Sequence, residues 1–195
     1  MIKKLFLYCQ NHFSWKNLGL LITLQTGLRI GEICGLWWGD LDFKTGFFRI
    51  VHTLQRIKKI NSKARSRKTQ IKLTDVKTIN AFREIPLSQN LLKTLKPFKK
   101  NLFPHFFVLT NGLKPLEPRR FDYYYHQVLE LLKIPFLNFH GLRHSFAARL
   151  IENEADYKTV SVLLEHSNIK TTLDFYVHPN FKQKKKYLDQ IFQKL

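Results

Sequence analysis

Residues 140–179 of the chain read HGLRHSFAARLIENEADYKTVSVLLEHSNIKTTLDFYVHP. The run opens with His140 and Arg143, which are three positions apart and share one face if this segment is helical. It closes with Tyr176, which follows His166 by ten residues. Four side chains that can bind anions or move protons therefore lie in one short stretch with helical periodicity.

The residues around this run predict an α+β fold that is mainly helical with a small antiparallel β-sheet. Strands are expected over 41–57, with a turn at 44–46, and over 82–87, while 58–76 predict a polar, basic loop or hairpin tip. Helices are expected over residues 1–25, 28–39, 88–96, 121–132, 141–152, 156–166, 169–177 and 181–195, with Ser88 and Asp156 as N-caps. No repeat or linker divides the sequence, which predicts one domain over residues 1–195.

The charge of the chain predicts a polyanionic partner. Its 195 residues carry 33 Lys and Arg against 14 Asp and Glu, a net charge of +19 at pH 7. This favours nucleic acid, because each phosphate contact releases counterions, over the alternative of a membrane surface. No apolar run is long enough for a membrane span or a signal peptide. Cys9 and Cys34 lack metal-ligand spacing, so we expect reduced thiols in a cytoplasmic protein.

Two basic clusters are expected to contact a nucleic acid backbone. Residues 43–74 include no Asp or Glu, and a second cluster at 182–186 lies near the C-terminus. Basic runs are often only solvated faces, but two of them in an already basic chain favour contacts with a duplex. The predicted DNA-binding residues of the first cluster are Arg56, Lys58, Lys59, Lys63, Arg65, Arg67 and Lys68.

The sequence also contains the side chains that phosphodiester cleavage without a metal ion requires. Arginine can neutralise non-bridging phosphate oxygens through paired hydrogen bonds, and Arg29 and Arg143 are the candidates. A nucleophile must attack phosphorus, and a second group must protonate the leaving oxygen. Taken singly, Arg29 could form only a salt bridge with Glu32, and Tyr176 could be a packing residue. No acidic cluster suited to a metal-dependent nuclease is visible, so we expect neither a metal nor a cofactor.

Three segments together carry a resemblance to a known family. They read TGLRIGE at residues 26–32, HGLRH at 140–144 and LLEHSNIKTTLDFYVHP at 163–179. This pattern resembles that of the tyrosine recombinases, and in particular the integrases of phages and conjugative transposons. The resemblance covers nearly the whole chain. It implies the catalytic-domain fold of that family and an activity in site-specific DNA recombination and integration.

The resemblance assigns roles to the residues around the phosphate. Arg29 and Arg143 would clamp the scissile phosphate, and Glu32 would be an accessory residue that helps orient Arg29. His140 and His166 would complete the hydrogen bonding of the phosphate and assist proton transfer.

The resemblance also implies the nucleophile and the general acid. Tyr176 would attack phosphorus, giving a 3′-phosphotyrosyl intermediate and a free 5′-hydroxyl. The family uses a lysine on a β-hairpin as general acid. Lys77 matches that position, since it precedes the segment REIPL at residues 83–87, and Lys72 is the second candidate.

Residue 165 departs from the family pattern. The family usually has glycine where this chain has Glu165. If the position needs a left-handed backbone, a residue other than glycine costs roughly 1–2 kcal/mol, and a carboxylate beside a phosphate pocket could repel DNA. The benign alternative is that Glu165 turns away and pairs with a nearby lysine.

The short segment before Arg29 is a second departure. Full integrases carry a separate helical core-binding domain there, but only 28 residues precede Arg29 in this chain. We therefore expect that domain to be absent, in an excised catalytic domain or a truncated reading frame. Because these enzymes grip DNA with both domains, we expect weak DNA binding with little sequence specificity.

The resemblance implies double-stranded DNA as the partner and a tetramer on paired DNA sites. An excisionase or a DNA-bending protein would be a further partner. The last expected helix, 181–195, would dock on a neighbouring protomer or fold back onto its own core. Two alternatives to an active recombinase stay open: a catalytically silent DNA-binding remnant, and a relaxing topoisomerase that uses the same chemistry.

Overall fold

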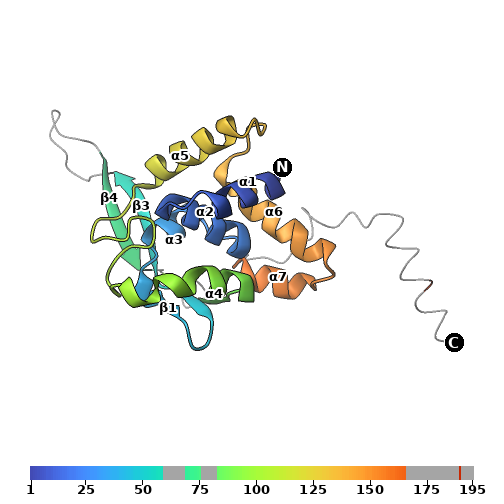
Figure 1. Ribbon diagram of the computed structural model, residues 1–195, viewed down its shortest axis with the longest axis horizontal. Helices are drawn as coiled ribbons and strands as arrows, with labels where there is room; N and C mark the ends of the chain where they lie inside the picture. The colour runs from blue at the N-terminus through green and yellow to red at the C-terminus, as the bar shows by residue number, and fades with distance from the viewer. Residues whose placement is uncertain (59–68, 76–82, 166–188, 190–195) are drawn as a thin grey trace.

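The computed structural model describes residues 1–58, 69–75, 83–165 and 189, and it confirms the predicted fold class, a mainly helical α+β fold with small antiparallel sheets (Figure 1). The helices are α1 (Ile2–Asn11), α2 (Trp15–Thr26), α3 (Ile30–Gly35), α4 (Gln89–Leu95), α5 (Pro118–Leu131), α6 (Phe139–Glu152) and α7 (Tyr157–Leu163), with short 3-10 turns η1 (Trp38–Asp40) and η3 (Lys96–Asn101). The strands are β1 (Leu41–Asp42), β2 (Phe47–Ile50), β3 (His52–Lys58), β4 (Thr69–Asp75) and β5 (Arg83–Pro86). The helix expected over 169–177 lies outside the described residues, and so does the one expected over 181–195 except for Asp189.

Helix α2 forms the centre of the main hydrophobic core. Leu20, Ile22 and Leu24 are fully buried, and the helix is apolar on almost every side. That pattern is typical of a helix surrounded by other elements. Helices α1, α4, α5 and α6 all pack against α2. In Figure 1, α1 lies beside α2 in the blue centre of the molecule.

Side chains that cap helix N-termini set most of the helix starts. Ser88 and Asp156 begin α4 and α7 as predicted, since the oxygen of each accepts a backbone N–H three residues later. The single helix expected over residues 1–25 is wrong, because Ser14 starts a new one. Its hydroxyl accepts the N–H of Asn17 at 3.0 Å, so the segment forms α1 and α2 with a turn between them.

The strands form two separate antiparallel pairings. Strands β1, β2 and β5 make a three-stranded sheet in that order, whereas β3 and β4 make a two-stranded ribbon. Two expectations are corrected. Val51 interrupts the single strand expected from Phe47 to Ile57, and residues 69–75, expected in a loop or a long hairpin tip, form β4, which pairs with β3. Ile71 and Leu73 alternate with polar residues, as in a strand, but the surrounding stretch is polar and basic, and both faces of β4 are largely exposed.

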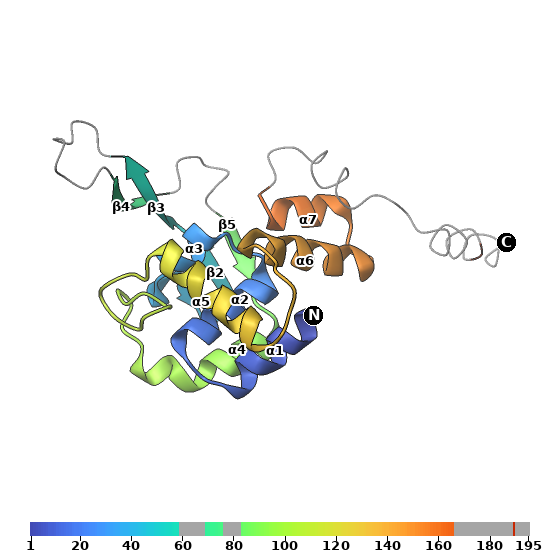
Figure 2. The ribbon, with the colours of Figure 1, turned by 90° about the horizontal axis from the view of Figure 1, so that it is seen from above.

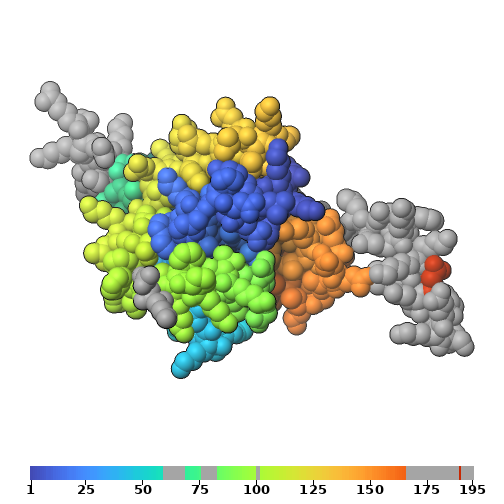
Figure 3. Space-filling view, viewed as in Figure 1, coloured from blue at the N-terminus to red at the C-terminus, as the bar shows by residue number. Residues whose placement is uncertain are grey.

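Helices α6 and α7 enclose a second, smaller apolar cluster. Its buried members are Ala147, Val160 and Leu164, with Phe146 and Leu150 packed against them. In Figure 3 the orange surface of these helices lies directly beside the blue surface of the N-terminal helices.

None of the helices in the described part of the chain has the length and apolar character that crossing a bilayer requires. In Figure 2 the β3–β4 ribbon, β5, α6 and α7 follow one edge of the molecule, and α1 and α4 lie away from that edge.

Candidate phosphate-binding site

A sharp turn between α2 and α3 places the first predicted arginine. Helix α2 ends at Gly27, whose φ of 67° lies in the left-handed region. A Cβ at this position would lie 2.6 Å from Cδ1 of Phe146 in α6, so the close packing also requires glycine. The turn leads directly to Arg29, which precedes the first residue of α3.

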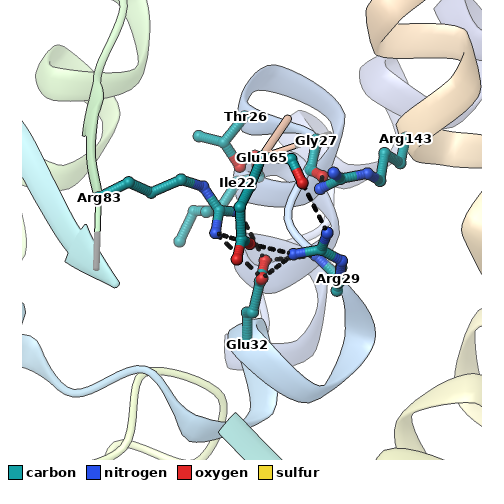
Figure 4. A network of polar contacts seen from close by, with 8 residues as sticks. All are labelled: Ile22, Thr26, Gly27, Arg29, Glu32, Arg83, Arg143 and Glu165. Carbon is teal, nitrogen blue, oxygen red and sulfur yellow. Dashed lines mark hydrogen bonds and ion pairs between the residues drawn. The ribbon is translucent and has the colours of Figure 1, made fainter. Parts of the chain in front are cut away.

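Glu32 connects the start of α3 to two guanidinium groups. Its Oε2 accepts the backbone N–H of Arg29 at 2.8 Å, and its Oε1 accepts Nη1 of Arg29 at 2.8 Å (Figure 4). The same carboxylate accepts Nη2 of Arg83 at 2.9 Å and Nη1 of Arg83 at 3.2 Å. The Glu32 side chain is only 4% exposed. A carboxylate with this many charged donors can stay ionised when buried, and it fixes the orientation of both arginines.

Arg83 is a member of the site that the sequence did not identify. It lies on β5, where Arg83 and Ile85 are buried and Glu84 and Pro86 are exposed. Its side chain is 8% exposed, and its Nε has no hydrogen-bond partner among the described residues. The sequence signal that could have identified Arg83 is an arginine at an inward-facing position of a short strand. Burial of an arginine there is favourable only when it has an acidic partner.

Glu165, at the end of α7, points into this cluster. Its carboxylate contacts Nη1 of Arg29, and it accepts Nη1 of Arg83 at 2.8 Å (Figure 4). Of the two alternatives for Glu165, the one in which it turns away and pairs with a lysine is contradicted, since its partners are two arginines. The suspected backbone requirement is confirmed, because φ at Glu165 is 50°.

Arg143 approaches the cluster from α6. Its side chain is buried, and Nη1 donates to the carbonyl oxygen of Gly27 at 3.0 Å. Within the described residues Nη2 has no hydrogen-bond partner. Burial lowers the pKa of Arg143 to about 10, and the positive charge of Arg29 nearby adds to the effect. A buried cationic donor without an anionic partner is suited to bind an external anion.

His140, near the start of α6, lies close to Arg143 and Arg29. His140 stacks edge-on against His144 with ring centroids 4.6 Å apart. Burial lowers the pKa of His140 below its usual value, and His144, Arg143 and Arg29 lower it further. The neutral imidazole therefore predominates at neutral pH, and it can donate one N–H.

Glu32 and Arg29 both stay ionised in the cluster, because each stabilises the charge of the other. Burial alone raises the pKa of Glu32, but Arg83 first and then Arg29 outweigh it, so the net pKa is lowered. Burial alone lowers the pKa of Arg29, but Glu32 and Glu165 reverse this and the net pKa is raised. With Arg83 and Arg143 included, the cluster of three arginines and two glutamates keeps one excess positive charge, which favours an anion.

The structure thus brings together Arg29, Glu32, His140 and Arg143 from α3 and α6, segments more than a hundred residues apart in the sequence. The other predicted residues of the phosphate chemistry, Lys77, His166 and Tyr176, lie outside the described residues. The same holds for the predicted DNA contacts Lys59, Lys63, Arg65, Arg67 and Lys68. Lys72, the second candidate for the general acid, is exposed on β4.

Two predicted DNA contacts are described, and they differ. Lys58 is exposed at the end of β3. Arg56 is engaged inside the chain: Nε donates to Oε1 of Glu117 at 2.9 Å, Nη2 contacts the same oxygen, and Nη1 donates to Thr69 at 2.7 Å. Arg56 thus ties the β3–β4 ribbon to the start of α5, and its contact with DNA stays a prediction. Across the described ranges, no group of three His, Cys, Asp or Glu side chains is placed to hold a metal ion.

The chain is similar to proteins of known class along most of its length. The model of the phage integrase family matches residues 1–183. A tyrosine recombinase XerC-like protein of Caldanaerobacter subterraneus subsp. tengcongensis is 31% identical over 179 residues, covering 84% of this chain and 46% of the relative. The transposase of transposon Tn916 from Enterococcus faecalis is 26% identical over 175 residues, covering 83% of this chain and 42% of the relative.

Solved structures share the fold. The Tn1549 transposon integrase, in complex with a circular intermediate DNA, superposes with a TM-score of 0.76 at 22% identity, covering 97% of this chain and 63% of that one. The XerA recombinase gives a TM-score of 0.67 at 17% identity, covering 97% of this chain and 60% of that one. This chain spans about half the length of the curated relatives it matches. Because the family model covers nearly all of its residues, the chain belongs to the phage integrase family.

Proposed function

We propose that the chain is the catalytic domain of a site-specific DNA recombinase that cuts and rejoins DNA strands through a 3′-phosphotyrosyl intermediate. The observation that carries this proposal is the buried cluster in which Arg29 and Arg143, from distant segments, face the same space beside Glu32. Membership of the phage integrase family supports it, as does the fold shared with the DNA-bound Tn1549 integrase.

The arginine cluster would stabilise the charge that develops on the phosphate. Attack on phosphorus places extra negative charge on the two non-bridging oxygens, and preoriented guanidinium groups lower the energy of that state. Arg143 offers Nη2, which has no partner within the described residues, and Arg29 is oriented by its bonds to Glu32. His140, neutral because its pKa is lowered, would donate one N–H to a phosphate oxygen without adding repulsion between cations.

The bond changes balance without an external energy source. The Tyr176 hydroxyl gives up its proton, its oxygen forms a bond to phosphorus, and the bond from phosphorus to the 5′-oxygen breaks. Lys77, or else Lys72, would protonate the leaving 5′-oxygen, and His166 would assist with the proton of the nucleophile. The phosphotyrosyl ester keeps the energy of the phosphodiester, so a 5′-hydroxyl can later attack it and reseal a strand.

The partner in this proposal is double-stranded DNA, bound through the cluster and through exposed basic residues such as Lys58. The structure of a lambda integrase tetramer on a Holliday junction shares this fold, at a TM-score of 0.55, and a tetramer on paired sites is part of the proposal. An excisionase or a DNA-bending protein would join that assembly, in the cytoplasm.

A covalent-trapping assay tests the proposed function. Wild type and Tyr176→Phe are mixed with nicked duplexes from DNA flanking the gene, in excess chelator, and denatured samples are examined for DNA-linked protein. We expect a linked species with wild type alone, since only the nucleophile is lost in the variant. If both proteins shift DNA in a gel but neither becomes linked, the chain is a silent DNA-binding remnant and the proposed activity is wrong.

A further inference from the structure

Glu165 occupies hydrogen-bond donors that an incoming phosphate would need. A guanidinium carries two N–H groups on each Nη nitrogen. Those of Nη1 in Arg29 already meet Oε1 of Glu32 and Oε2 of Glu165. Nη1 of Arg83 likewise donates to both carboxylates, those of Glu32 and Glu165. In this state a phosphate oxygen finds no free donor on Nη1 of Arg29.

The two carboxylates of the cluster are held very differently. Glu32 is 4% exposed and also accepts a backbone N–H, whereas Glu165 is 20% exposed. The backbone of Glu165 has a φ of 50°, which is unfavourable for a side chain with a Cβ. Its side chain is held by the ion pairs with Arg29 and Arg83, and its backbone carbonyl oxygen accepts Nη2 of Arg29 at 3.4 Å. An anion that supplies equivalent charge can replace such a carboxylate at little structural cost.

We propose that Glu165 is the resident anion of the arginine cluster, and that a phosphate must displace its carboxylate before it can bind Nη1 of Arg29. Residue 165 thereby sets the anion affinity of the site. That the displacing anion is a DNA phosphodiester rests on the proposed function, whereas the displacement itself does not. In the occupied state the cluster has one excess positive charge, and moving Glu165 away leaves two. A monoanionic phosphodiester then restores the charge of the resting state.

Titration with inorganic phosphate tests the displacement directly. Wild type, Glu165→Gln and Glu130→Gln are titrated by calorimetry at low ionic strength. Glutamine has nearly the same shape as glutamate but no charge, so it competes less well for the guanidinium groups. We expect Glu165→Gln to bind phosphate with a dissociation constant about ten-fold lower than that of wild type. Glu130 is exposed on α5, and its variant controls for the change in net charge.

The outcomes separate this inference from the proposed function. Equal or weaker phosphate binding by Glu165→Gln overturns it, as does an equal gain in Glu130→Gln. If Glu165→Gln does not fold, as judged by its thermal transition, Glu165→Gly decides by the same titration, since glycine also relieves the positive φ. The covalent-trapping assay is run on the same variants. Tighter phosphate binding without any linked DNA would leave the displacement standing and count against the recombinase activity.

Discussion

The α3 side and the α7 side of the arginine cluster hold their carboxylates in opposite ways. On the α3 side, Glu32 is buried, lies in a helix and bonds to a backbone N–H as well as to two guanidinium groups. On the α7 side, Glu165 is more exposed, lies just past a helix end and has a strained φ. The Glu32 carboxylate is therefore part of the fixed framework of the site. The Glu165 carboxylate is an occupant, which means that it fills the anion position and can be replaced by another anion.

The described residues form two hydrophobic clusters, and α6 contributes to both. Ile33 beside Glu32 and Leu142 beside Arg143 belong to the main core, whereas Leu164 beside Glu165 belongs to the smaller cluster of α6 and α7. The ion pairs of Glu165 with Arg29 and Arg83 therefore depend on how closely α7 packs against the rest of the described residues.

The largest expected effect on stability comes from the α3 side. Glu32→Gln removes the buried carboxylate shared by Arg83 and Arg29 and leaves Arg83 only the more exposed Glu165, and breaking such a buried pair costs about 3–5 kcal/mol. Glu165→Gln should cost less than about 1 kcal/mol, since its partners keep Glu32. Denaturant unfolding of both variants beside wild type measures the difference. Equal losses would remove the distinction between framework and occupant.

The largest effect on catalysis is expected at Arg143. Arg143→Ala removes a preoriented donor to the transition state, which is typically worth about 3–4 kcal/mol, or a fall of about 10²–10³ in cleavage rate. Single-turnover cleavage of the nicked duplex measures it. Arg120→Ala, which removes an equal charge from an exposed position on α5, is the control. Cleavage at the normal rate in Arg143→Ala would remove that residue from the phosphate clamp.

The contribution of Glu32 is expected to depend on pH. Although burial alone raises its pKa, Arg83 and Arg29 make the net pKa lower than usual. The stabilisation is therefore complete above the unfolded pKa of about 4.3, and it is lost as pH falls through the lower folded pKa. Melting temperatures of wild type and Glu32→Gln should differ most near neutral pH and converge in strong acid. A gap that widens with acidity would contradict this assignment.

The smallest expected effect lies at the Arg56–Glu117 pair, which joins the β3–β4 ribbon to the start of α5. Arg56→Ala breaks the pair with Glu117, which is partly exposed and worth about 0.5–1 kcal/mol. Hydrogen exchange of the β3 and β4 amides should accelerate, while that of α2 stays unchanged. Lys58→Ala, at the exposed end of the same strand, should leave exchange as it was. If both variants behave alike, Arg56 does not anchor the ribbon.

The sequence predicted those parts of the fold that local chemistry determines. Ser88 and Asp156 marked helix starts because capping acts over three residues. Strand β4 was assigned to a loop or hairpin tip because the polar, basic stretch around it obscured the alternation of Ile71 and Leu73 with polar residues. Arg29, Arg143 and Glu32 were identified by pattern, but Arg83 was not, since its role comes from the approach of β5 to α3. The arginine partners of Glu165 could not be predicted for the same reason, since they lie 82 and 136 residues away.

The most direct test of the central claim is to identify the residue that becomes attached to DNA. The trapped protein–DNA species is digested with protease and nuclease, and the modified peptide is sequenced by mass spectrometry. The account predicts a phosphoryl link on the hydroxyl of Tyr176, at the 3′ side of the cut, formed in the presence of chelator. A link on any other residue, or strand cleavage that leaves no link and stops when metal ions are removed, would contradict it.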